Sequence, residues 1–394
     1  MPQNLRLAIV GSGPAGLMAA THAILAQPKA EIHVFERHPG FGRKLLIAGS
    51  SGLNISHHCS PSEFVNHYRG FASAWWETLF NEFGPSHWIQ FIEEELKLKT
   101  FIGTSDRYFV EEMKGANLLK TWIEFLKSKK VNFHSNHLLQ DFTLHDKKIK
   151  LKFSSNEMHE FDRVGLFLGG GSWEDTEPEW CTWMCDKGIS IEAFHPSNVG
   201  YEANFSEKFL QEAEGKPLKK ISMKTERGEK QGELVITQYG IEGTPVYFVG
   251  IPGPATLDLK PDLTQNQIEE RLNHVRENWS PIRRVKRTLQ LSVASESLLF
   301  HHAPESAKAS VKAMAAIIKK FPLDLIQARP LSEAISSGGG IAINAVTDNL
   351  ELRSFPEIFC GGEMLSWDAP TGGFLIQACV SQGAKIGLNL VRGV

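Results

Sequence analysis

The chain has 394 residues, of which 42% are hydrophobic, and its formal net charge is −3. This length exceeds that of a typical single core, so two or three domains are expected. The near-neutral charge provides no general attraction to nucleic acid or anionic membranes. No apolar run reaches the roughly 20 residues of a membrane helix. Five cysteines and a start without a signal segment favour a reducing compartment, so we predict a cytoplasmic protein.

The first motif lies in residues 5–37. LRLAIV predicts a buried parallel strand, LMAATHAILA a helix, and EIHVFE a second strand that ends in Glu36. Between the first strand and the helix, Gly11, Gly13 and Gly16 form a G-x-G-x-x-G turn, and Glu36 follows Gly16 by 20 positions. This is the dinucleotide-binding βαβ pattern. Gly11 permits the tight turn, Gly13 the approach of a pyrophosphate, and Gly16 close helix–strand packing, while Glu36 would accept hydrogen bonds from a ribose.

The middle of the chain predicts a change of architecture. Short helices are expected over 61–97, a hairpin near 100–110, a helix over 115–130 and a buried strand that ends at Gly169 and Gly170. Short strands with turn signals then fill 196–262, and helical patterns fill 263–322. We therefore predict an α/β, Rossmann-like FAD-binding domain of the glutathione-reductase type, built from residues 1–195 and 336–394. An inserted β-rich and helical domain would occupy 196–335, with the active site in the crevice between the two.

A second glycine-rich element lies near the end of the chain, in EIFCGGEMLSWDAPTGGFLIQACVSQG. Gly362 permits close passage of a ligand, and Glu363 can bind a ribityl hydroxyl. Gly372 and Gly373 precede a helix whose N-terminal N–H groups favour an edge that becomes negative on reduction. This chemistry favours FAD over NAD as the bound dinucleotide.

These segments, with RKLLIAGSSGLN, DRYFVEEMKGANLL, LFLGGGSW and GELVITQYGIEG, resemble a family of FAD flavoproteins with an inserted domain. The family includes aminoacetone oxidases and bile-acid-type ene reductases, and the resemblance covers nearly the whole chain. It implies a cofactor site formed by Gly11, Ser12, Gly13, Pro14, Ala15, Gly16, Glu36, Arg37, Lys44, Leu45, Asn54, Leu139, Gly169, Gly170, Gly362, Glu363, Gly373, Phe374 and Gln377.

The sequence departs from this family at three positions. Gly52 and Leu53 stand where relatives commonly carry Arg-Cys, and Val110 stands where a proline is usual. A second G-x-G-x-x-G for a nicotinamide is absent, so either the substrate reduces FAD or NAD(P)H docks transiently. We expect hydride transfer between a small organic substrate and flavin N5. An oxygen-using amine oxidase is the enzymatic alternative.

Candidate catalytic residues are Arg107 and Lys114, which lie between cofactor-binding elements, and Asp368, for which capping of the last helix is the preferred interpretation. A basic patch at Arg283, Arg284, Lys286 and Arg287 is the basis for the alternative of a tRNA- or RNA-binding flavoprotein. No metal site is expected, because Cys181 and Cys185 have no second ligand pair. The sequence leaves the oligomeric state open.

Overall fold

The computed structural model describes residues 5–48, 52–103, 106–111, 113–146, 148–155, 157–173, 176–275 and 278–393. The chain divides into two compact units, one formed by residues 1–195 and 336–394 and the other by residues 196–335. Positions 49–51, which belong to the glycine- and serine-rich segment before Asn54, lie outside the described residues.

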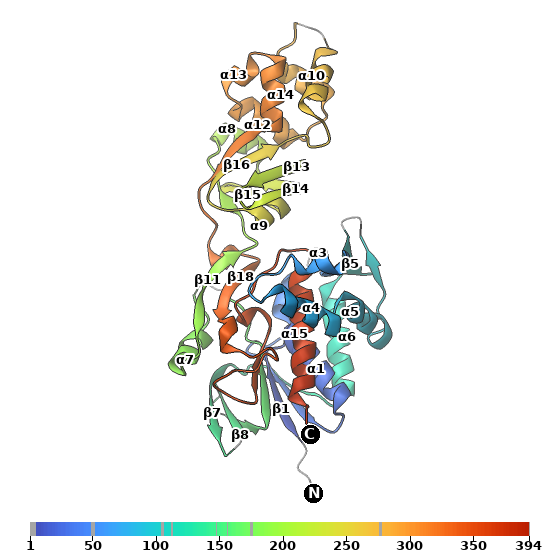
Figure 1. Ribbon diagram of the computed structural model, residues 1–394, viewed down its shortest axis with the longest axis vertical. Helices are drawn as coiled ribbons and strands as arrows, with labels where there is room; N and C mark the ends of the chain where they lie inside the picture. The colour runs from blue at the N-terminus through green and yellow to red at the C-terminus, as the bar shows by residue number, and fades with distance from the viewer. Residues whose placement is uncertain are drawn as a thin grey trace. The chain divides into compact units, whose positions relative to one another are not determined.

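The first unit is built on a five-stranded parallel sheet with the order β19-β10-β1-β2-β6 (Figure 1). The strands are β1 (Arg6–Val10), β2 (Glu31–Phe35), β6 (Asn132–His134), β10 (Arg163–Leu166) and β19 (Ile358–Cys360). Since β19 comes from the last 40 residues and pairs with β10, both ends of the chain share one sheet. The parallel sheet and the preceding family motifs give the expected Rossmann-type α/β class.

Helix α1 (Pro14–Ala26), near the start of the chain, and helix α15 (Phe374–Leu390), near its end, lie side by side (Figure 1). Glycines on α15 make this close approach possible. A Cβ at Gly383 would overlap the carbonyl oxygen of Ala15, and one at Gly387 would overlap that of Ala19. The C-terminal helix is therefore packed directly on the helix that follows the glycine-rich turn.

Smaller sheets and helices surround this core. The β3-β5-β4 sheet contains β3 (Asn54–His57), β4 (Thr100–Ile102) and β5 (Arg107–Val110). The β7-β8-β9 sheet contains β7 (Leu139–His145), β8 (Lys148–Phe153) and β9 (Met158–Phe161). The helices are α2 (Arg43–Ala48), α3 (Pro61–Val65), α4 (Ser73–Glu82), α5 (Pro85–Gln90), the π-helix η1 (Phe91–Glu95), α6 (Gly115–Ser128) and α7 (Trp180–Asp186). The two-stranded pair is β11 (Ile191–Ser197) with β18 (Ser336–Ile341), and the short 3-10 turns are η3 (Ile343–Ala345) and η4 (Gly362–Met364).

The second unit contains a six-stranded sheet with the order β12-β15-β14-β13-β16-β17. Its strands are β12 (Tyr201–Glu202), β13 (Pro217–Thr225), β14 (Gly228–Ile236), β15 (Gly240–Glu242), β16 (Gly253–Asp258) and β17 (Phe321–Leu325). Its helices are α8 (Glu207–Ala213), α9 (Thr244–Val249), α10 (Gln265–Asn273), α11 (Pro281–Thr288), α12 (Val293–His302), α13 (Glu305–Lys308), α14 (Val311–Lys319) and the turn η2 (Leu331–Glu333). Strand β17 follows the helices and pairs antiparallel with β16, so the β part does not end at residue 262.

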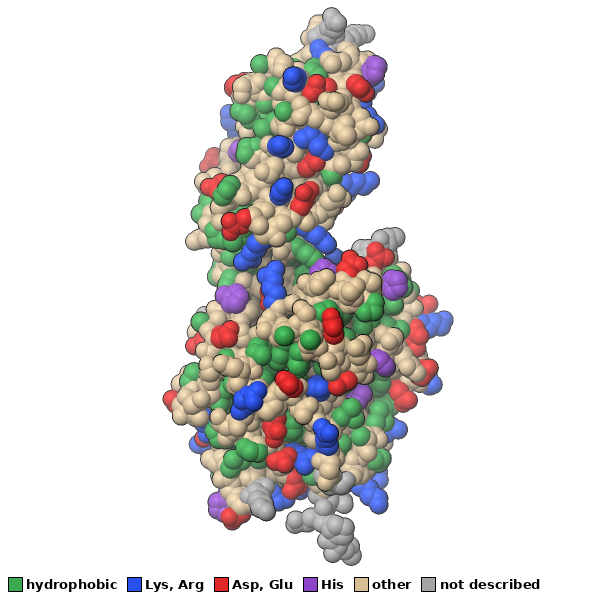
Figure 2. All heavy atoms as spheres, viewed as in Figure 1, with side chains coloured by type: hydrophobic (Ala, Val, Ile, Leu, Met, Phe, Trp, Pro, Cys, Tyr) green, Lys and Arg blue, Asp and Glu red, His purple; other side chains and the backbone are tan. Residues whose placement is uncertain are grey.

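The basic patch predicted from the sequence lies on α11, but its four cations do not share one solvated face. The side chain of Arg284 is buried, and its guanidinium donates to the carbonyl oxygens of Trp279 and Leu272. Arg283 lies over the Trp279 ring at 4.4 Å. On the face of the molecule seen in Figure 2, acidic and basic side chains are interspersed. Among the described residues, no helix is long and apolar enough to cross a membrane.

Candidate functional site

The glycine-rich turn between β1 and α1 is shaped by backbone crowding. Gly11 has φ +109°, and a Cβ there would overlap the Phe167 carbonyl oxygen. A Cβ at Gly16 would overlap the Gly11 carbonyl oxygen. Gly13 differs, because a Cβ would meet no atom of the described residues within 4 Å. Gly11 and Gly16 are thus required by the fold, whereas Gly13 borders open space at the N-terminus of α1, where free N–H groups favour an anion.

Glu36 closes the turn from the end of β2. Its carboxylate accepts hydrogen bonds from the Ser12 N–H (3.2 Å), the Ser12 hydroxyl and the His38 N–H (3.1 Å). The Ser12 hydroxyl oxygen in turn accepts from the Gly42 N–H at 3.0 Å. This network fixes the acid at the mouth of the turn, in the position that the spacing predicts for a ribose-binding group.

A cavity of about 460 Å³ opens over the turn. This lies within the roughly 300–1,000 Å³ typical of small-molecule sites. The predicted cofactor residues on its wall are Gly11, Ser12, Gly13, Pro14, Ala15, Glu36, Arg37, Lys44, Leu139, Gly169, Gly362 and Glu363. The structure therefore brings the N-terminal turn and the C-terminal Gly-Gly-Glu element to one cavity within one unit.

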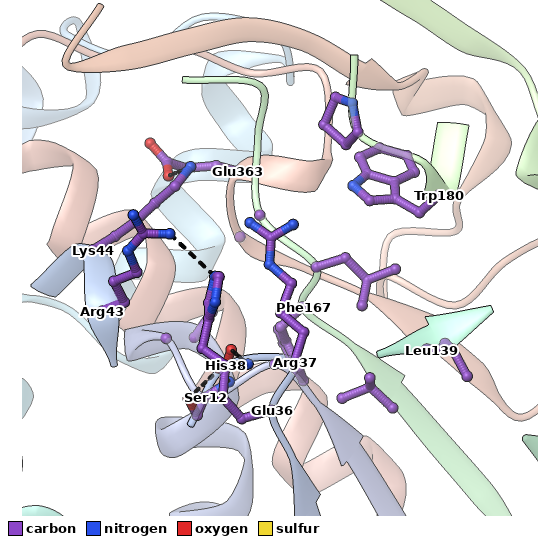
Figure 3. Close-up of a pocket in the computed structure, with 18 of the residues that line it drawn as sticks. Ser12, Glu36, Arg37, His38, Arg43, Lys44, Leu139, Phe167, Trp180 and Glu363 are labelled. Atoms are coloured by element: carbon purple, nitrogen blue, oxygen red, sulfur yellow. Dashed lines mark hydrogen bonds and ion pairs between the residues drawn. The ribbon is translucent and has the colours of Figure 1, made fainter. Parts of the chain in front are cut away.

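Lys44 and Glu363 lie at one end of this cavity and Ser12 and Glu36 at the other (Figure 3). The Lys44 amine donates to the Gly170 carbonyl oxygen at 3.3 Å and to the Ser172 hydroxyl at 3.2 Å, and lies 4.0 Å from the Glu363 carboxylate. Burial raises the pKa of Glu363, and the nearby Lys44 cation opposes that rise. Gly170 thus contributes its carbonyl to holding Lys44, although it is not on the cavity wall.

The residues predicted for the far end of the cofactor lie away from this cavity. Gly373 has φ +100° and packs so closely on the Ser56 backbone that a Cβ would overlap it. Gln377 is fully buried, accepting from the Ser56 hydroxyl at 2.7 Å and donating to Ser381 at 3.0 Å. Phe374 is 1% exposed and stacks on aromatic neighbours. In the structure, these three residues hold β3 against α15.

Two buried polar atoms in the antiparallel β3–β5 strand pair, the Arg107 Nε and the Asn54 Oδ1, have no hydrogen-bond partner among the described residues. Arg107 on β5 is the register partner of His57 on β3, and the His57 Nδ1 lies 3.3 Å from the Gly372 carbonyl oxygen. A Cβ at Gly372 would lie 3.2 Å from the Arg107 Nε. Burial lowers the pKa of the Arg107 guanidinium. Buried polar atoms without partners are uncommon and mark where a bound molecule would supply one.

The other predicted site residues have roles in the fold. Lys114 is exposed at the N-cap of α6, away from the cavity. Asp368 does not cap α15, since the N-cap is Gly373 five positions later; the Asp368 carbonyl oxygen instead accepts from the Arg69 N–H at 2.9 Å. Leu45 is 3% exposed and packs in the core.

Sequence reasoning missed several residues of the cavity wall. They are supplied by the loop after β2, the start of α2, the segment between β6 and β7, the end of β10 and the start of α7, and include His38, Arg43, His137, Phe167 and Trp180. Figure 3 shows Trp180 and Leu139 across the cavity from Lys44. The sequence could have indicated Arg43, because it directly precedes the predicted Lys44. Trp180, by contrast, reaches the cavity only through the tertiary position of α7.

The residues present fit a dinucleotide whose second half extends away from the phosphate-binding turn. The phosphate turn is open at Gly13, the ribose acid is in place, and the β3–β5 strand pair holds buried polar atoms that lack a partner in the described part of the chain. Because the glycine elements from both chain ends line one cavity, the fold and the site define a Rossmann-type, FAD-dependent oxidoreductase.

Comparison with known proteins identifies the family within this class. The chain belongs to the HI0933-like family, since the model described as "HI0933-like protein Rossmann domain" matches residues 5–389. It is 21% identical to a 3-dehydro-bile acid delta(4,6)-reductase of Clostridium scindens, over 97% of this chain and 98% of that protein.

Two solved structures share the fold at low identity. One is the 3-ketosteroid-delta4-(5alpha)-dehydrogenase of Rhodococcus jostii RHA1 with 4-androstene-3,17-dione (TM-score 0.53, 14% identity, 99% of this chain and 98% of that chain). The other is the 3-ketosteroid delta1-dehydrogenase of Sterolibacterium denitrificans with 1,4-androstadiene-3,17-dione (TM-score 0.52, 10% identity, 98% of each chain).

Proposed function

We propose that this protein transfers a hydride between FAD and a small organic substrate whose carbon–carbon double bond is conjugated to a carbonyl group. The observation that carries the proposal is the half-buried Arg107 side chain, whose buried Nε lies beside Gly372, at the turn that leads into α15. A similar protein named as a bile-acid reductase, which aligns over nearly its whole length, supports the substrate class.

When bound, FAD supplies a hydride donor or acceptor at ring atom N5. The chain's own residues would bind and orient it: the turn at Gly13 would hold the pyrophosphate, Glu36 a ribose, and Glu363 the ribityl chain. Hydride delivery to the carbon β to the carbonyl group would place negative charge on the carbonyl oxygen, and a proton from water would then complete the reduction at the α carbon. Arg107 and the N–H groups at the start of α15 present positive charge and hydrogen-bond donors to such an oxygen or to the reduced ring.

An anaerobic titration tests the direction of electron flow. The purified flavoprotein is expected to absorb near ~450 nm, and NADPH or NADH should bleach this band before a 4-ene-3-keto steroid restores it. An amine oxidase would behave differently: nicotinamides would leave the band unchanged, an amine such as aminoacetone would bleach it, and oxygen would restore it. That second pattern would replace the proposed reductase with the oxidase, and protein that takes up no FAD would refute both.

Arg107→Gln tests the role of the guanidinium. We expect kcat to fall by about 10²–10³-fold, the typical cost of removing one donor to a developing oxyanion, with partial recovery in Arg107→Lys. FAD content and thermal stability should stay near wild type. Lys120→Gln is the matched control, since Lys120 is a 74% exposed cation of the same unit. Equal kcat in Arg107→Gln and Lys120→Gln would exclude Arg107 from the reaction.

A further inference from the structure

Three potential metal ligands converge next to the cavity, although the sequence predicted no metal site. They are His137, in the segment between β6 and β7, Glu157, just before β9, and His159 within β9. One ring nitrogen of each histidine and a Glu157 carboxylate oxygen all lie within 4.8 Å of one another. Because the ligands come from separate segments, their spacing in the sequence carries no metal-site signature.

The hydrogen bonds of His137 fix which of its ring nitrogens is free to bind an ion. Its Nδ1 lies 2.7 Å from the carbonyl oxygen of Ser135. A carbonyl oxygen only accepts, so the Nδ1 carries the hydrogen and a neutral ring presents the Nε2 lone pair to Glu157. Histidines that bind metals are held in this way, with the second ring nitrogen donating to a carbonyl or carboxylate.

The separations match those of donors around one small ion. The His137 Nε2 lies 3.2 Å and the His159 Nε2 lies 3.3 Å from the same Glu157 Oε2. For ligands about 2.0–2.1 Å from a tetrahedral ion, neighbouring donor atoms are about 3.3 Å apart. Because the His137 hydrogen is on Nδ1, the contact of its Nε2 with the carboxylate needs a cation between the two atoms, either a proton or a metal ion, whereas a neutral His159 can donate its own N–H to that oxygen.

We propose that His137, Glu157 and His159 bind one divalent transition-metal ion of the zinc type, with a remaining position for water. Two imidazoles and a carboxylate suit Zn²⁺ and its neighbours better than Mg²⁺ or Ca²⁺, which prefer oxygen donors. The exposures of the side chains, 19% for His137, 54% for Glu157 and 32% for His159, leave the site open to the solution.

The ion would also stiffen one wall of the nucleotide cavity. His137 lines the cavity, and its N–H donates to the Glu36 carbonyl oxygen at 2.8 Å. The next residue but one, Leu139, lines the same wall. We therefore expect bound metal to strengthen dinucleotide binding without entering the chemistry at Arg107. This consequence depends on the proposed cofactor site, whereas the metal site itself does not.

Metal binding is measured on tag-free, chelator-treated protein by competition of Zn²⁺ with a chromophoric chelator. We expect one equivalent to bind, and Glu157→Gln or His159→Ala to weaken binding by at least about 100-fold, since even outer-shell changes cost about 10–100-fold. His145→Ala is the control, because His145 is exposed and pairs only locally with Asp146 at 3.2 Å. Circular dichroism and thermal unfolding check that each variant is folded.

Two results would overturn the site. The first is that the wild-type protein binds Zn²⁺ no more tightly than the double variant Glu157→Gln/His159→Ala. The second is that both single variants bind Zn²⁺ as tightly as wild type. The coupling is tested by FAD titration of the same apoprotein with and without Zn²⁺. Tighter FAD binding with Zn²⁺ in wild type, absent in His159→Ala, supports it. Unchanged FAD affinity with the metal bound would refute the coupling, and failure of FAD to bind at all would refute the proposed function instead.

Discussion

Gly13→Ala separates a requirement of the ligand from a requirement of the fold. Gly13 has φ −71° and ψ 178°, a conformation that alanine adopts without strain. Within the part of the chain that the structure describes, an added Cβ would meet no atom within 4 Å. The apoprotein should therefore keep its stability or gain about 0.4–1 kcal/mol, as when glycine is replaced at a compatible position.

Ligand binding should respond in the opposite direction, because the methyl group enters the space over the first turn of α1. A pyrophosphate held away from one N–H loses a charge-assisted hydrogen bond worth about 1.5–3 kcal/mol. At about 1.4 kcal/mol per tenfold, FAD affinity should fall by roughly 10- to 150-fold. The assay is fluorescence titration of apoprotein with FAD, beside thermal unfolding of the same apoprotein.

Two comparison variants sharpen this test. Gly40→Ala also meets no atom within 4 Å, but Gly40 is not on the cavity wall, so its FAD affinity should equal that of wild type. Gly16→Ala would overlap the Gly11 carbonyl oxygen and should destabilise the apoprotein itself. If Gly13→Ala binds FAD as tightly as Gly40→Ala does, the pyrophosphate does not pass over Gly13 and the assignment of the turn is wrong.

Three further changes test other parts of the unit. Thr21→Val leaves the buried Trp122 Nε1 without its acceptor at 2.9 Å, so urea denaturation should show a loss of about 1–3 kcal/mol; an unchanged midpoint would contradict this. In Gly383→Ala the new Cβ would overlap the Ala15 carbonyl oxygen, which should lower the free energy of unfolding by about 1–3 kcal/mol and weaken FAD binding. Full FAD affinity in this variant would show that α15 does not position the turn. Burial raises the pKa of Glu363 above its ordinary 4.5, so apoprotein stability falls as pH rises from about 4.5 through the raised value. Apo Glu363→Gln should therefore melt higher than wild type at neutral pH, with the difference vanishing in acid; a difference independent of pH would refute that linkage.

Local patterns in the sequence were sufficient for the elements that one stretch of chain determines. The G-x-G-x-x-G spacing located the turn before α1, because only glycine tolerates the crowding at Gly11 and Gly16. The helical pattern over 115–130 predicted α6, which the structure forms over Gly115–Ser128 with Leu118, Trp122 and Leu126 on its buried face. Such signals arise from steric rules that operate within a few residues.

The ring end of the site was harder to predict, since its residues are placed by contacts between distant segments. Gln377 carries a polar side chain that the family resemblance assigns to the flavin ring, yet it is satisfied by Ser56 and Ser381. The unpartnered Nε of Arg107 depends on burial between β3 and the turn at Gly372, which no periodicity reveals. Likewise, the two histidines and the glutamate beside β9 meet only after the β7-β8-β9 sheet has formed.

The packing of α15 on α1 explains why the two glycine elements line one cavity. Gly383 brings α15 onto the backbone of Ala15, and a Cβ at Gly362 would lie 3.2 Å from the Ala15 side chain. The Gly362 N–H donates to Gln382 on the same helix at 2.8 Å. The first turn of α1, which would hold the phosphates, is therefore positioned by the last helix of the chain, so a ligand that bridges both elements must stabilise α15 as well as the turn.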